Sequence, residues 1–169
     1  MRGIFFRQVL DYIKNDRGHT SFEVLEKKSE DYTAEEKYSF DEFMELLARI
    51  KLITANEDDY VARISRDTMM MEATWKNLFR RMDPVNVFAS TKRQDGRHQT
   101  GDYEPILLEK GHVMLRMKLW TENRNHQELW TDFYRGRLEG ILGLIGRNGT
   151  VKVTKEFGNG GYTYDIEWT

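Results

Sequence analysis

The sequence contains no cysteine, and this absence excludes several chemistries at once. Disulfide bonds, thiolate metal sites, iron–sulfur clusters and a cysteine nucleophile all require a thiol. Proline is nearly absent as well, because Pro84 and Pro105 are the only 2 in the chain. Proline therefore interrupts the chain at only these two points.

Charge of one sign does not prevail either: 26 lysines and arginines face 28 acidic residues, a net charge of -2. Such a domain has no bulk attraction for nucleic acid or for an anionic membrane surface. Long apolar runs are also lacking, and the opening MRGIFFRQVLDY is too soon broken by Arg7 and Asp11 for a signal peptide or a membrane span. We expect a cytoplasmic protein that binds no nucleic acid.

Length and apolar content indicate one folded domain. The 169 residues fall within the usual range of about 100–200 for a single core. Hydrophobic residues make up 39% and aromatic residues 12%, enough apolar surface to fill that core. We predict a single domain over residues 1–169, with a helical part at 1–83 and a sheet with a crossing helix at 101–169.

Helical spacing dominates the first half of the chain. Apolar residues recur at helical intervals in segments 5–13, 40–52 and 60–82, and the last of these predicts one long helix or two joined ones. Ser39 and Glu42 form a capping-box signal just before the second segment. Residues 92–102 are polar and predict a loop.

Strand-like alternation begins beyond Pro84. Residues 103–109 and 112–120 flank the turn Lys110-Gly111 and predict a β-hairpin. Helical spacing returns over 127–145, and a second hairpin is predicted from 150–155 and 162–168 around a glycine-rich turn at 158–161. Four such strands make an antiparallel sheet with one face covered by helices, an α+β domain.

Three segments of this C-terminal part carry a family resemblance: FYRGRLEGILG at 133–143, VKV at 151–153 and YDIEW at 164–168. They resemble the C-terminal signature of the heme nitric-oxide/oxygen-binding-like superfamily, which also holds vinyl-reductase-type domains and subunits of the transport-protein-particle tethering complex. RGIFF at 2–6 and YSFDEF at 38–43 resemble the N-terminal pattern of a myxobacterial-type bacterial branch. The resemblance implies a sensory or ligand-binding domain in signalling, and a homodimer.

Heme ligands expected from this resemblance are missing. The heme-binding pattern has a histidine on the helix before the first hairpin and a Tyr-x-Ser-x-Arg motif near the second strand. The helix ending near Met82 contains no histidine, and 112–117 reads HVMLRM. We expect His98 and His112 at the surface, His19 and His126 as exposed or capping residues, and no cofactor. No two histidines are closer than 14 positions, so we also expect no metal site.

Two glycines mark a special position on the predicted helix 127–145. Gly136 and Gly140 lie one turn apart, and a glycine costs up to about 1 kcal/mol inside a helix. Close approach of the helix to the sheet or to a ligand would offset this cost, and we favour packing on the sheet.

Methionines and aromatic residues could line an adaptable apolar cavity with an arginine at its rim, although a plain core also fits them. The candidate ligand-binding residues are Met70, Trp75, Phe79, Phe133 and Arg137. We predict a non-enzymatic domain without heme that binds a small apolar ligand or a protein partner. The alternatives are a heme-dependent gas sensor and an enzyme that uses an unrecognised carboxylate pair.

Overall fold

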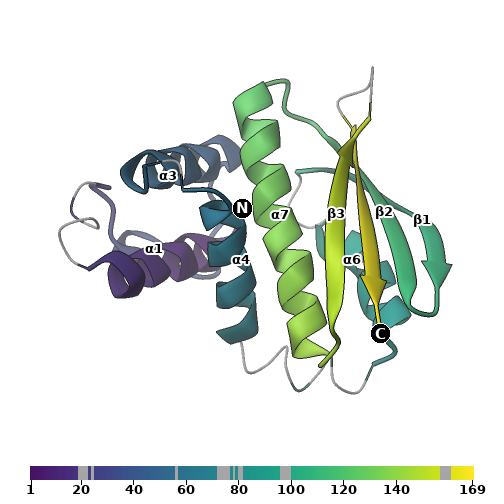
Figure 1. Cartoon of the computed structure of the whole chain (residues 1–169). Coiled ribbons are helices and arrows are strands. Elements are labelled where there is room, and N and C mark those ends of the chain that lie inside the picture. Colours follow the sequence, from purple (N-terminus) through teal and green to yellow (C-terminus); the bar gives the residue numbers. More distant parts are fainter. Residues whose placement is uncertain are drawn as a thin grey trace.

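Helices precede and cross a four-stranded sheet in the computed structural model (Figure 1). The structure describes residues 1–18, 23, 25–55, 57–71, 77, 79, 82–95, 100–156 and 161–169. The helices are α1 (Gly3–Arg17), α3 (Phe40–Ile53), α4 (Tyr60–Met71), α6 (Pro84–Asp95) and α7 (Arg124–Leu144), with a short 3-10 helix η1 (Ser29–Asp31). The strands are β1 (Gly101–Glu109), β2 (His112–Leu119), β3 (Gly149–Lys155) and β4 (Gly161–Trp168).

The sheet has the order β1-β2-β4-β3, and every neighbouring pair is antiparallel. Gly111 has a φ of 87° in the tight turn between β1 and β2, a conformation that glycine adopts without strain. The predicted α+β class and the succession of hairpin, long helix and hairpin are confirmed. The predicted turn at 158–161 lies mostly outside the described residues.

One face of the sheet carries both helices of the C-terminal part. On β4, Tyr164 contacts Tyr134 of α7 with ring centroids 5.2 Å apart, and Trp168 contacts Phe88 of α6 at 5.5 Å. Residues with the same parity on a strand share a face, so α6 and α7 cover the same side. Among the described elements, the opposite side has no covering helix.

α7 is itself covered on its second side by the N-terminal helices (Figure 1). Phe43 of α3 is fully buried and packs edge-on against Phe6 of α1 at 5.0 Å and against Phe133 of α7 at 5.2 Å. The predicted cap of α3 is confirmed, because the Ser39 side chain accepts a hydrogen bond from the backbone N–H of Glu42 at 2.9 Å. The domain thus has three layers, with α7 in the middle.

Helix α6 is a correction, because the sequence predicted no helix between Pro84 and the first hairpin and a polar loop from residue 92. Two start signals were present: Pro84 is the first helical residue, and Asp83 accepts a hydrogen bond from the N–H of Val85 at 2.8 Å. The helix includes residues 92–95.

Within the described part of the chain, no helix has both the length and the apolar character needed to cross a membrane.

Candidate functional site

The glycines of α7 face α4, and the two helices touch through backbone atoms. A Cβ added to Gly136 would lie 1.9 Å from the carbonyl oxygen of Ala62, and one added to Gly140 would lie 2.8 Å from that of Arg66. The predicted close approach is confirmed, but its predicted partner is wrong: the glycines face a helix and not the sheet. No ligand-sized space separates α4 from α7 at these two positions.

The opposite side of α7 meets the sheet through hydrogen-bonded aromatic residues. Trp130 donates from Nε1 to the Tyr103 hydroxyl at 3.1 Å, and this hydroxyl lies 2.7 Å from Oγ1 of Thr100. Tyr164 is fully buried and donates to the backbone oxygen of Thr131 at 3.4 Å. Side chains therefore fill this contact, and the polar ends of Trp130, Tyr103 and Tyr164 have partners within it.

Burial holds the pKa of Tyr164 well above its ordinary value, because the phenolate would lose its hydration in this apolar layer. The hydroxyl therefore stays protonated and acts as a hydrogen-bond donor. Such a phenol is a poor metal ligand, since ligation by tyrosine requires the deprotonated oxygen.

Replacing Tyr103 by phenylalanine is expected to lower the free energy of unfolding by about 1–3 kcal/mol, because the buried N–H of Trp130 loses its acceptor. The same change at Tyr164 should cost less, about 1 kcal/mol or below, because its hydroxyl makes a long bond of 3.4 Å to the Thr131 carbonyl and a weak one of 3.9 Å to the Met117 sulfur. Urea denaturation of both variants measures the difference. Equal losses would contradict the role assigned to the Trp130 bond.

Two of the predicted ligand-binding residues, Phe133 and Arg137, lie on the side of α7 that faces the N-terminal helices. Phe133 has 2% of its surface exposed and stacks on Trp130 with centroids 5.6 Å apart. Arg137, one turn further along α7, places its guanidinium 5.4 Å from the ring centroid of Phe5 in α1. These two therefore belong to the packing of α7 against the N-terminal helices.

The other predicted residues lie elsewhere. Met70 at the end of α4 is 45% exposed and lines an open groove of about 580 Å³ together with Gly143 and Val151. Phe79 is buried, with 2% of its surface exposed, and Trp75 falls outside the described residues. A shared ligand site formed by the five residues stays a prediction.

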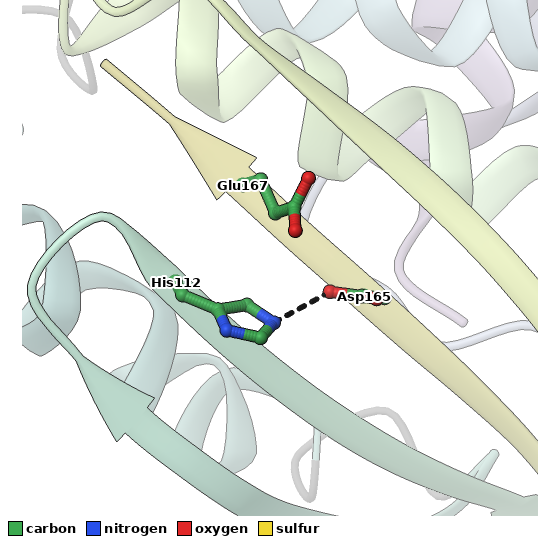
Figure 2. A group of neighbouring side chains, drawn as sticks. All are labelled: His112, Asp165 and Glu167. Atoms are coloured by element: carbon green, nitrogen blue, oxygen red, sulfur yellow. Dashed lines mark hydrogen bonds and ion pairs between the residues drawn. The ribbon is translucent and has the colours of Figure 1, made fainter.

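The two histidines within the described residues are partly buried, with side chains 33% and 16% exposed, and both face carboxylates. On β2, His112 has its Nε2 atom 2.7 Å from Oδ1 of Asp165 on β4, and Glu167 lies beside them (Figure 2). His126 at the start of α7 has its Nδ1 atom 3.2 Å from Oδ1 of Asp41 on α3. His19 and His98 lie outside the described residues.

Acidic side chains gather in a second groove of about 380 Å³ beside the start of α4. Burial raises the pKa of Asp132 in this groove, which is a common feature of acid–base sites. Two neighbouring acids are engaged in ion pairs, however: Glu57 with Arg63 at 3.0 Å and Asp59 with Arg135 at 2.5 Å. Among the acids of this groove, Asp132 therefore has a raised pKa, Glu57 and Asp59 are held in ion pairs, and Asp58 is exposed.

Taken together, the helical layers, the crossing helix and the four-stranded sheet define the fold of H-NOX domains. The chain is similar in structure to H-NOX domains along its whole length. It superposes on the Fe(II) unliganded H-NOX protein from K. algicida with a TM-score of 0.78, 15% identity and coverage of 100% of this chain and 97% of that chain.

An oxygen-binding H-NOX domain related to soluble guanylate cyclases gives a TM-score of 0.72, with 13% identity and coverage of 100% of this chain and 95% of that chain. A variant of the H-NOX domain from T. tengcongensis gives 0.73, with 13% identity and coverage of 100% and 98%. The fold that the sequence resemblance predicted is therefore confirmed. No protein-family model and no curated protein matches the sequence.

Proposed function

We propose that this chain is a heme-independent sensory domain with the H-NOX fold, which binds a protein partner at its surface. The observation that carries the proposal is the filled contact between α7 and the sheet, where Trp130, Tyr103 and Tyr164 satisfy one another and the backbone. A domain of this kind keeps the architecture of a sensor, while the side chains of its interior pack against one another and bind no cofactor. The predicted homodimer belongs to the same proposal.

The positions of the described histidines support a domain without heme. Its iron needs an axial ligand from a rigid position in an apolar pocket, supplied by histidine, cysteine, methionine or tyrosine. Cysteine is absent from the sequence, and His112 and His126 face carboxylates. α6, the helix before the first hairpin, contains no histidine. The buried phenol of Tyr164 is held protonated, which disfavours ligation.

Surface binding is favoured over an enclosed apolar ligand by the shape of the grooves. Three grooves of about 540, 380 and 580 Å³ are described, and all open to solvent. The first, between α1 and α4, is lined by Tyr12, Asp67 and Met71 among others. Met71 is 74% exposed there, and an exposed, flexible methionine side chain suits contact with another macromolecule.

Heme addition tests the proposal directly. We expect purified protein to carry no heme and to give no Soret band of ligated heme after titration with hemin, because neither described histidine lies in an apolar pocket. The four single variants His19→Ala, His98→Ala, His112→Ala and His126→Ala should behave like the parent. A heme-loaded protein that loses its Soret band in one of these variants would establish the gas-sensor alternative instead.

Native mass spectrometry separates the two binding modes. A protein partner or a second copy should give a mass that is a sum of polypeptide chains. A small co-purifying mass that survives desalting and disappears in Phe133→Ala would instead support the apolar ligand site.

A further inference from the structure

The uncovered face of the sheet holds one cluster with metal-binding donor atoms. The pairing of β2 with β4 sets His112 opposite Glu167 and Met114 opposite Asp165. The imidazole of His112 on β2 therefore faces two carboxylates that are two residues apart on β4 and point to the same side (Figure 2). Two paired strands of a four-stranded sheet fix the backbone of all three residues.

We propose that His112, Asp165 and Glu167 bind a divalent transition-metal ion such as Zn²⁺. One donor atom from each residue lies within 4.8 Å of the other two. Three atoms so arranged can all lie within about 2.8 Å of a common point, against metal–ligand bonds of about 2.0–2.2 Å to nitrogen and oxygen. Side-chain rotations that move each donor atom by about 0.7 Å close this gap without moving the strands.

The donor set selects the class of ion. Imidazole nitrogen suits Zn²⁺, Cu²⁺, Ni²⁺ and Co²⁺, whereas Mg²⁺ and Ca²⁺ prefer oxygen ligands alone. Two carboxylates and a neutral imidazole together balance the charge of one divalent cation. Three protein ligands leave a coordination position for water, the arrangement of exchangeable sites as opposed to closed structural ones.

Exposure and charge around the cluster agree with an exchangeable site. The side chains of His112 and Asp165 are 33% and 32% exposed, and that of Glu167 is 54% exposed, so an ion can enter from solvent. Glu109 pairs with His112 on the other side and adds a further acid at this end of the sheet. Lys152 lies 3.8 Å from Glu167 and is the cation that the metal would displace from this carboxylate.

A bound ion would connect the outer face to the covered one. It would link β2 to β4 next to Trp168, whose ring packs on Phe88 of α6 with centroids 5.5 Å apart on the opposite side. The backbone N–H of Trp168 also donates to the Gly111 oxygen at 2.9 Å, in the turn that precedes His112. Metal occupancy would thus tighten the end of the sheet on which α6 rests. This inference does not depend on the proposed function.

Titration of chelator-treated protein with Zn²⁺, followed by calorimetry, and with Co²⁺, followed by visible absorption, tests the site. We expect one equivalent of each ion to bind. His112→Ala and Glu167→Gln should each weaken Zn²⁺ binding by at least about 100-fold. Even the mutation of a residue that only hydrogen-bonds to a metal ligand lowers metal affinity about 10–100-fold. Co²⁺ absorption should lose its ligand-field bands in both variants.

Matched controls come from the same molecule. His126→Ala removes a histidine that also faces a carboxylate, at 3.2 Å, and Glu104→Gln removes a 62% exposed acid on the same face of the sheet. Both should bind Zn²⁺ like the parent, and metal-free circular dichroism checks that every variant is folded. Absence of saturable binding in the parent protein, or an unchanged affinity in either His112→Ala or Glu167→Gln, would overturn the proposal and leave His112 and Asp165 as a hydrogen-bonded pair only.

Discussion

Replacing Gly136 by alanine is expected to lower the free energy of unfolding by about 3 kcal/mol or more, since the new methyl group has no room. It would lie 1.9 Å from the carbonyl oxygen and 2.6 Å from the carbonyl carbon of Ala62. These are backbone atoms of α4, so no side-chain rotation relieves the overlap. Helices α4 and α7 must therefore move apart, and the close packing between them is lost. Urea denaturation, followed by circular dichroism, measures the change.

Gly143→Ala is the matched control on the same helix. There the added Cβ would meet the side chain of Met70 at 3.2 Å, and this side chain is 45% exposed and free to move outward. Alanine is favoured over glycine by about 1 kcal/mol within a helix, so the control should be neutral or slightly stabilising. A similar loss in both variants would attribute the effect to α7 in general and contradict the role of the α4 contact.

Sequence patterns predicted those parts of the fold that local rules determine. Alternation on both sides of Gly111 predicted the first hairpin, and Ser39 predicted the start of α3, because turns and caps depend on a few adjacent residues. The same local rules, applied to Asp83 and Pro84, would have predicted α6. That helix was missed because its second half is polar and predicted a loop from residue 92.

Contacts between distant segments were beyond those rules. Helical spacing placed Phe133 and Gly136 on α7 correctly, but spacing cannot tell which neighbour covers each side of a helix. The candidate metal cluster could not be predicted for the same reason. His112 and Asp165 are 53 positions apart and meet only through the register of β2 and β4. A search for closely spaced histidines cannot find a site in which a single histidine meets two acids of another strand.

The second large effect is expected for Phe43→Ala, which should lower the free energy of unfolding by about 3–5 kcal/mol. Phe43 is fully buried, and its ring meets Phe6 of α1 at 5.0 Å, Phe133 of α7 at 5.2 Å and Trp130 at 6.5 Å. Truncation removes the apolar surface of the ring from the core and leaves a cavity where three helices meet. Thermal and urea denaturation should both record the loss.

Leu52→Ala, on the same helix, provides the comparison, because Leu52 is 70% exposed and its truncation should change stability by less than about 0.5 kcal/mol. The cavity left by Phe43→Ala would adjoin Phe133, one of the predicted ligand-binding residues. A small apolar probe should therefore bind to the variant and raise its melting temperature, but leave the melting temperature of the parent unchanged. Equal stabilisation of the parent by the probe would mean that a cavity already exists beside Phe133, and would favour the apolar ligand over the protein partner.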